Sequence, residues 1–268
     1  MDNVKVEMQG RVAIVTLDRP PVNALDYKTF AEIAEAFESL NRGRDASVAI
    51  FTSAGGRAFC GGVDLQDSPR RHRPDGRHDD DSPKGDATDQ LDPGRIVRRC
   101  FWSIYEGGIP VIAAVDGPAI GAGVALVGSC DLVVASDNAR FALTEINVGV
   151  LGGVKHAQRL LGPFKSKRMF LTGEYVSADE LYRFGSIEAV VPPEELLPTA
   201  VDIAERIAAK SPLAVRLAKE SANRVEALGL QEGYRVEQDY TVRVKRYRDS
   251  DEARVAYLEK REPDFRWE

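Results

Sequence analysis

Residues 110–117, Pro-Val-Ile-Ala-Ala-Val-Asp-Gly, contain five consecutive apolar residues followed by an Asp-Gly turn. A short apolar run that ends at turn residues predicts a fully buried strand, Val111–Val115. The small residues of the next stretch, Ile120–Val127, are suited to the start of a tightly packed helix. A buried strand that leads through a turn into a helix is typical of an α/β protein.

The same kinds of element are predicted on both sides of this stretch. Three further short runs rich in β-branched residues predict strands over 12–17, 48–52 and 132–135. After the first of them, Asp26 is suited to cap a helix, because apolar side chains then recur at helical spacing up to residue 40. The strand over 48–52 leads into residues 53–65, whose four glycines indicate unusual backbone angles or a close backbone approach.

The C-terminal part of the chain is predicted to be helical. The pattern changes from about Leu151, and residues 177–180, Ser-Ala-Asp-Glu, have the form of a capping box. Four helices are then expected, over residues 197–209, 212–228, 230–247 and 250–260. We therefore expect an α/β core over residues 1–196, with a mobile surface loop at about 66–95, and an all-helical region over 197–268.

The composition excludes several classes of protein. Of the 268 residues, 43% are hydrophobic and 29% are charged, proportions that are typical of a soluble globular protein. The net charge of -6 argues against a nucleic-acid partner, because nucleic-acid-binding surfaces are usually basic. No run of 18 apolar residues predicts a membrane span, and the first residues do not have the pattern of a signal peptide. We expect a cytoplasmic protein without a membrane partner.

The cysteine and histidine residues predict neither disulfides nor a metal site. Cys60, Cys100 and Cys130 are widely spaced and form no C-x-x-C pair, which favours a reducing compartment. His72 and His78 lie near a run of aspartates, but in a mixed-charge segment without a recognisable ligand spacing. A solvated loop is the better interpretation of that segment.

Each of the two glycine-rich stretches follows a predicted strand and is able to present backbone N–H groups to a ligand. Neither matches G-x-G-x-x-G or G-x-x-x-x-G-K-[ST], which excludes the usual dinucleotide and nucleoside triphosphate sites. The stretch after Val115 opens a helix, where free N–H groups favour an oxygen that gains negative charge. The alternative is that small residues serve only for close packing of helix and sheet. The residues alone leave both interpretations open.

Several stretches occur together in a specific order and spacing. They are Arg-Pro-Pro-Val-Asn-Ala-Leu at 19–25, Phe-Cys-Gly-Gly-Val-Asp-Leu at 59–65, residues 110–117, Cys-Asp-Leu at 130–132, Phe-Ala-Leu-Thr-Glu-Ile-Asn-Val-Gly at 141–149, and the closing 259–265. With them the chain resembles the crotonase, or enoyl-CoA hydratase/isomerase, superfamily over essentially its whole length. The resemblance implies a crotonase-like (ClpP/crotonase) α/β fold, a spiral of β-β-α turns with a C-terminal all-helical trimerisation region. It also implies a homotrimer or a dimer of trimers.

The resemblance further implies a site for an acyl-CoA thioester. In the family the thioester oxygen lies between two backbone N–H groups, which fall here on Val63 and Ala122. Gly61 matches the position whose carbonyl meets the adenine of coenzyme A, and Arg19 is a candidate for its phosphates. Glu145 matches a family glutamate that transfers protons, although Thr144 replaces the usual proline. Coenzyme A belongs to the substrate, so no separate cofactor is expected.

One departure from the family pattern bears on the reaction. Family hydratases use two glutamates, and Ala125 stands at the position of the other one. The apolar neighbours of Glu145 should raise its pKa toward neutrality, which suits a group that takes and returns a proton. We expect an enoyl-CoA hydratase or isomerase that uses Glu145, with an isomerase needing only one base. A hydroxycinnamoyl-CoA hydratase-lyase and a non-catalytic acyl-CoA-binding scaffold are the alternatives.

Three further side chains are accessory candidates. The hydratase-lyases carry a similar segment, here Thr-Glu-Ile-Asn at 144–147, and a helper tyrosine, for which Tyr234 and Tyr240 are possible equivalents. Both tyrosines are also suited to packing between helices. His156 follows Glu145 closely and is able to orient water or a substrate oxygen, or else lies exposed at a helix start.

Overall fold

The computed structural model of the protein describes residues 1–65, 91–92 and 94–268. Its main sheet has the strand order β1-β2-β3-β4-β6-β9, in which β1 is antiparallel to β2 and every other neighbouring pair is parallel. The strands are Val4–Gln9 (β1), Val12–Leu17 (β2), Val48–Ser53 (β3), Val111–Val115 (β4), Leu132–Ser136 (β6) and Ala189–Val191 (β9). The four strands predicted from apolar runs are confirmed to within one residue.

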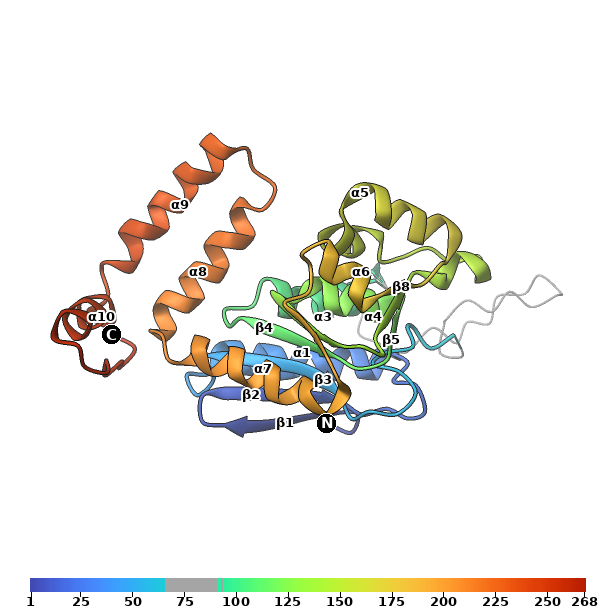
Figure 1. Ribbon diagram of the computed structural model, residues 1–268, viewed down its shortest axis with the longest axis horizontal. Helices are drawn as coiled ribbons and strands as arrows, with labels where there is room; N and C mark the ends of the chain where they lie inside the picture. Colours follow the sequence, from blue (N-terminus) through green and yellow to red (C-terminus); the bar gives the residue numbers. More distant parts are fainter. Residues whose placement is uncertain (66–90, 93) are drawn as a thin grey trace.

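Helices cover both faces of this sheet (Figure 1). The helices α1 (Tyr27–Arg42) and α3 (Arg95–Tyr105) pack together on one face, and α7 (Pro193–Ala208) lies on the other. In β4, Ile112 and Ala114 belong to the cluster under α7, whereas Val111, Ala113 and Val115 belong to the main core. Both sides of β4 are therefore buried, which explains a continuous apolar run instead of alternation.

A second, smaller sheet lies beyond the carboxyl ends of the central strands. It consists of β5 (Pro118–Ile120), β7 (Arg140–Ala142) and β8 (Val176–Ser177), in the order β5-β7-β8. The helix α4 (Ala122–Ser129) begins two residues after β5. The sequence prediction that placed Ile120 in the helix start is therefore wrong at that residue. The cause is a hydrogen-bonded ladder with β7, which pairs Ile120 with Ala142.

The remaining core elements connect the second sheet to α7. They are a short 3₁₀ helix, η1 (Thr144–Val148), followed by α5 (Val154–Thr172) and α6 (Ala178–Arg183). The capping box predicted at 177–180 is confirmed at its first residue, since Ser177 Oγ accepts a hydrogen bond of 3.2 Å from the N–H of Glu180. Asp26 caps α1 in the same way, by accepting from the N–H of Thr29 at 2.7 Å.

Three helices form an arm that extends away from the core (Figure 1). They are α8 (Pro212–Val225), α9 (Leu230–Val244) and α10 (Arg248–Glu259). The ammonium group of Lys219, on α8, is buried against the core, where it lies 2.8 Å from Asp131 and donates to the carbonyls of Ile104 and Ile109. The boundary predicted at residue 196 falls inside α7, which packs on the sheet. The predicted loop at about 66–95 lies largely outside the described residues.

The three cysteines are buried as free thiols in different parts of the core. Cys60 precedes Gly61 in the glycine-rich stretch, Cys100 is on α3, and Cys130 caps the end of α4. Burial raises the pKa of Cys60 to about 12 and raises the pKa values of the other two thiols as well. Among the described helices, none is long and apolar enough to cross a membrane.

Candidate active site

The fold brings the two glycine-rich stretches side by side at the carboxyl ends of β3 and β4. Cys60 pairs with Ala119 in an isolated β-bridge, in which the N–H of Ile120 donates to the carbonyl of Cys60 at 2.9 Å. The next turn needs a glycine, because a Cβ atom on Gly62 would lie 3.2 Å from the carbonyl oxygen of Ile120. Gly62 also has a φ of +94°, which side chains disfavour. Residues 60–63 therefore run directly against the start of α4.

Among the described residues, no hydrogen-bond acceptor is found for the N–H of Val63 or for that of Ala122. Ala122 is the first residue of α4, so its N–H has no acceptor within the helix. The N–H of Val63 has no hydrogen-bond acceptor among the described residues, although its neighbours Gly62 and Asp64 are both bonded to Leu25. Val63 is 47% exposed and Ala122 is 8% exposed. The structure thus places both predicted donors in adjoining turns.

Gly61 lies in the same turn as Val63. Its N–H donates to the carbonyl of Val22 at 2.8 Å. A Cβ atom at this position would lie 3.0 Å from that same carbonyl oxygen, so the close approach favours glycine. Gly61 thereby helps to fix the turn, beside the role that the family resemblance implies for its carbonyl.

The Glu145 carboxylate lies against the start of α4. Glu145 is on η1, and a Cβ atom on Gly121 would lie 2.0 Å from its Oε1 atom. Gly121 directly precedes α4 and has a φ of +54°. The Oε2 atom of Glu145 is buried and has no hydrogen-bond partner among the described residues. A carboxylate oxygen without a partner is available to a substrate proton.

Burial raises the pKa of Glu145, as the sequence predicted, but the source of the burial differs from the expected one. Of the apolar neighbours on which the prediction relied, Leu143 is fully buried. The other four side chains are exposed: Ile146, Val148, Val150 and Leu151. The Glu145 carboxylate packs beside Gly121, whereas these four apolar side chains stay exposed.

Ala125 lies one helical turn beyond Gly121. The N–H of Ala125 donates a hydrogen bond of 3.1 Å to the carbonyl of Gly121. Ala125 is 2% exposed. Its methyl group cannot transfer a proton or hold a water molecule by hydrogen bonding. No group of three or more His, Cys, Asp and Glu residues in the described part of the chain is arranged to hold a metal ion.

Arg19, the candidate for the phosphates of coenzyme A, is held by groups of the protein itself. Its guanidinium lies 2.8 Å from a carboxylate oxygen of Asp64 and 3.1 Å from one of Asp26. It also donates to the carbonyl of Ala24 at 2.8 Å. These bonds tie residues 19–24 to the turn that carries Val63.

The three accessory candidates do not meet Glu145 in this chain. The His156 ring packs on Phe101, with ring centroids 4.9 Å apart, and its burial lowers its pKa. Tyr240 donates a hydrogen bond of 2.9 Å to Glu220 on α8, so it packs within the arm. Tyr234 is on α9 of the same arm and is 57% exposed.

Sequence reasoning missed the contact between Gly121 and Glu145. In the sequence Gly121 is one of a run of small residues, and its partner Glu145 is 24 positions further along the chain. The local signal is a glycine immediately before a helix that itself begins with the small residues Ala122 and Gly123. Nothing in that signal identifies the carboxylate that occupies the space of the missing side chain.

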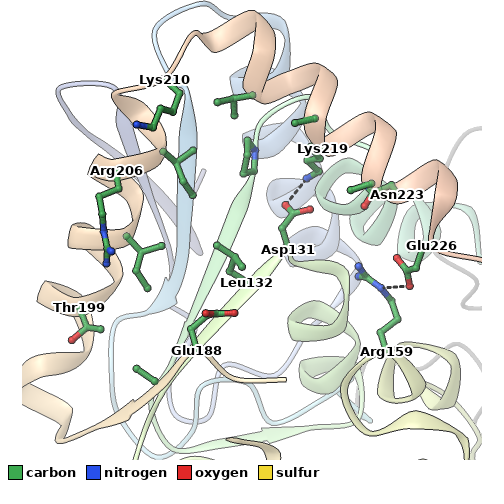
Figure 2. A pocket seen from close by; sticks show the side chains of 17 residues that line it. Asp131, Leu132, Arg159, Glu188, Thr199, Arg206, Lys210, Lys219, Asn223 and Glu226 are labelled. Carbon is green, nitrogen blue, oxygen red and sulfur yellow. Dashed lines mark hydrogen bonds and ion pairs between the residues drawn. The ribbon is translucent and has the colours of Figure 1, made fainter. Parts of the chain in front are cut away.

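A separate cavity of about 970 Å³ lies between α7 and α8 at the edge of the sheet. Figure 2 shows two ion pairs at this cavity, Asp131 with Lys219 and Arg159 with Glu226. Apolar side chains of both helices, among them Ile203, line much of the rest. The residues of the candidate active site do not line it.

Comparisons with known proteins identify the family to which the chain belongs. The family model for enoyl-CoA hydratase/isomerase matches residues 7–268. A (7aS)-7a-methyl-1,5-dioxo-2,3,5,6,7,7a-hexahydro-1H-indene-carboxyl-CoA hydrolase from Rhodococcus jostii (strain RHA1) is 36% identical, over 94% of this chain and 92% of the relative. A crotonyl-CoA hydratase from Syntrophomonas wolfei is 32% identical, over 98% of both chains. The crystal structure of an enoyl-CoA hydratase from Bacillus anthracis superposes with a TM-score of 0.86 at 30% identity, covering 99% of this chain and 100% of that one. The chain therefore belongs to the enoyl-CoA hydratase/isomerase (crotonase) superfamily.

Proposed function

We propose that the enzyme binds the carbonyl oxygen of an acyl-CoA thioester between the N–H groups of Val63 and Ala122, and that Glu145 transfers a proton on the acyl chain. The observation that carries this proposal is the buried, unpartnered Oε2 of Glu145, held against the residue that precedes Ala122. The Cys60–Ala119 bridge brings the Val63 turn beside the same segment, which supports a site made of one base and two donors.

The chemistry follows from where charge develops. When a proton leaves the α carbon, negative charge moves to the thioester oxygen, and fixed N–H donors stabilise that enolate more than they stabilise the substrate. Loss of one such donor typically costs ~10²-fold or more in rate. The raised pKa of Glu145 makes the carboxylate a stronger base and lets it return the proton afterwards.

Double-bond migration is the reaction that one carboxylate supports best. Glu145 takes a proton from C2 of a 3-enoyl thioester, the electron pair moves through the enolate, and the same carboxylate returns the proton at C4. Hydration of a 2-enoyl thioester needs a second group to hold the attacking water, and Ala125 removes the family's candidate. We therefore place isomerisation ahead of hydration.

Hydrolysis of a cyclic oxo-acyl-CoA is a second candidate function. It is favoured by two relatives named hydrolases of such a compound, which are 36% and 34% identical to this chain. One carboxylate suffices here too. Glu145 takes a proton from water, the oxygen adds to the ring carbonyl, the carbon–carbon bond to the α carbon breaks, and the proton returns to that carbon. The hydroxycinnamoyl-CoA cleavage has less support, because Tyr234 and Tyr240 lie on the arm.

The test is incubation of the protein in D₂O with 2-enoyl-, 3-enoyl-, hydroxycinnamoyl- and cyclic oxo-acyl-CoA thioesters, followed by mass spectrometry. Migration of the double bond with deuterium uptake supports the isomerase. Addition of water with the thioester intact identifies the hydratase or, on the cyclic substrate, the ring hydrolase, and release of an aldehyde identifies the lyase. Binding without conversion or α-proton exchange overturns the proposed function and leaves an acyl-CoA-binding scaffold.

We also propose that the protein assembles as a homotrimer or a dimer of trimers through its arm. Large apolar side chains are exposed on the arm, including Leu230 at 89% and Tyr257 at 83%. Exposed apolar groups of this size are typical of an interface. Size-exclusion chromatography with light scattering measures the molecular mass of the protein in solution. A monomer at micromolar concentration would contradict the proposed assembly.

A further inference from the structure

The carboxyl end of α4 is held by the guanidinium of Arg159, a residue of α5. Its Nη1 atom donates to the carbonyl of Gly128 and, at 3.4 Å, to the carbonyl of Cys130. All eight residues of α4 are buried, and the last carbonyls of a helix have no partner within it. A buried carbonyl needs a donor, and a cation at this end also complements the helix dipole. Arg159 meets both needs.

The helix α4 packs closely on α5 at both of its ends. A Cβ atom on Gly128 would lie 2.7 Å from the carbonyl oxygen of His156. At the other end, a Cβ atom on Gly153 would lie 3.4 Å from the carbonyl oxygen of Gly121. With eight residues, α4 is about 12 Å long, and a helix that is this short and closely packed moves as one piece. The contacts at its carboxyl end are therefore coupled to its first N–H group, which is the proposed donor.

Arg159 is itself fixed by the arm. Its Nε atom donates at 2.9 Å to the carboxylate of Glu226, the residue that follows α8, and the two side chains point toward each other in Figure 2. The guanidinium also lies over the ring of Tyr105, 4.6 Å from its centre, at the end of α3. The Tyr105 hydroxyl donates to Glu226 at 3.2 Å, and Asn223 of α8 donates to the carbonyl of Tyr105 at 2.5 Å. The end of α8 thus holds the guanidinium against α4.

We infer that Arg159 is a positioning residue that fixes the N–H of Ala122 for the thioester oxygen, and that the arm acts on the site through it. The inference rests on the proposed oxyanion site. Without the guanidinium, the carbonyl of Gly128 loses its charged donor within the core, and the end of α4 moves to regain a partner. The first N–H of the helix then shifts as well, and a displacement of about 1 Å at a catalytic donor costs up to ~10²-fold in rate.

The first experiment measures kcat and KM of Arg159→Met, which removes the charge and the donors but keeps an unbranched side chain. A positioning role lowers kcat about 10- to 100-fold and leaves KM nearly unchanged, because fixed donors act mainly on the enolate. Arg159→Lys keeps a cation at the end of α4 and should recover part of the loss. An unchanged kcat in Arg159→Met, or a rise in KM alone, would overturn the inference.

The matched control is Arg216→Met. The guanidinium of Arg216, on α8, donates at 2.7 and 2.9 Å to the carbonyls of Asn41 and Gly43, at the end of α1. It lies 5.0 Å from the centre of the Trp267 ring. Arg216 thus caps a helix and stacks on an aromatic ring, as Arg159 does, but α1 carries neither proposed donor nor the proposed base. Both variants should lose thermal stability, and only Arg159→Met should lose most of its kcat. Equal losses of kcat would show that Arg159 serves only the fold.

The role of the arm is tested by Glu226→Gln, which removes the charge that holds Arg159 from the end of α8. This variant should lower kcat in the same direction as Arg159→Met, by a smaller factor. Its control is Glu220→Gln, on α8, whose carboxylate accepts from Tyr240 at 2.9 Å and lies 3.4 Å from Arg243, both within the arm. The control should keep its kcat. An unchanged kcat in Glu226→Gln would overturn the role of the arm.

A last measurement does not depend on turnover. A thioester with a ¹³C-labelled carbonyl is bound to each variant, and the carbonyl stretch is read by infrared difference spectroscopy. The unchanged protein is expected to shift the band to lower frequency, and Arg159→Met is expected to lose much of that shift. If the unchanged protein polarises the carbonyl without converting any substrate, the proposed function fails while the role of Arg159 is still tested. No shift in the unchanged protein overturns the oxyanion site and the inference with it, and an equal shift in both proteins overturns the inference alone.

Discussion

The Oε1 atom of Glu145 lies where a side chain on Gly121 would have to begin, only 2.0 Å from the position of a Cβ atom. This contact joins two requirements of the site. Gly121, which directly precedes α4 and the N–H of Ala122, also leaves the space that the Glu145 carboxylate occupies. The proposed base and one of the proposed oxyanion donors are therefore positioned by the same turn.

Gly121→Ala is expected to lower kcat by ~10²-fold or more, because the new methyl group must displace the Glu145 carboxylate or the start of α4. Steady-state kinetics with the substrate found in the panel measures the loss. The matched control is Gly185→Ala, at a glycine with a φ of +76° and nothing within 4 Å of the added Cβ atom. Both variants place a side chain at a positive φ, but only the first crowds the carboxylate. Equal kcat values in the two variants would contradict the role of this contact.

Glu145→Gln is expected to abolish turnover and to leave the affinity for acyl-CoA nearly unchanged, since glutamine keeps the shape but carries no transferable proton. Isothermal calorimetry gives the affinity, and α-proton exchange in D₂O gives the chemistry. A variant that still exchanges the α proton at the original rate would remove Glu145 from the mechanism.

The raised pKa of Glu145 predicts two opposite effects of pH. The folded protein binds this proton more tightly than the unfolded chain, so the contribution of Glu145 to stability is fully present below its ordinary pKa, near 4.5, and is lost as pH rises through the raised value. Activity changes in the other direction, because kcat/KM needs the ionised base and falls as pH is lowered through the same value. As pH rises over the range in which the activity appears, the Tm of the unchanged protein should therefore fall relative to the Tm of Glu145→Gln. A pH-independent difference would contradict the assignment.

Lys219→Met is expected to destabilise the protein by about 3 kcal/mol, because it leaves the partly buried carboxylate of Asp131 without its ion-pair partner. Chemical denaturation measures the loss, and hydrogen exchange should show it first in α8, which Lys219 joins to the core. Lys210→Met, the same change at an exposed lysine, is the control. The double variant Lys219→Met/Asp131→Asn should recover part of the stability, and a further loss instead would contradict the pairing.

The sequence predicted the strands well where a single physical cause dominates. Val111–Val115 is buried on both faces, so an apolar run bounded by turn residues is sufficient to find it. The sequence prediction missed β5, because Pro118–Ile120 contains a proline and is only three residues long. Such a segment is a strand only because Arg140–Ala142 pairs with it, and that partner is about twenty residues away.

The family pattern predicts residues for the candidate site, but it does not predict their contacts. The family pattern pointed to Glu145, Val63 and Ala122, which the fold places in adjoining turns. The partners of Arg19 were not predictable, because a guanidinium suits phosphates and carboxylates equally well and only the fold brings Asp64 within 2.8 Å. The accessory role predicted for His156 relied on its closeness to Glu145 along the chain. In the structure its ring packs on Phe101 instead.

The three buried thiols allow local and global opening of the protein to be followed by chemical labelling. A thiol with a raised pKa and almost no exposed surface reacts very slowly with a disulfide reagent or an alkylating agent while the protein stays folded. Each labelling event therefore reports a local or global opening, and peptide mapping tells which of the three sulfurs was exposed. Because Cys60 lies beside the Val63 turn, Cys100 under the sheet and Cys130 at the end of α4, the order of their labelling gives the order in which the site, the helical layer and α4 come apart.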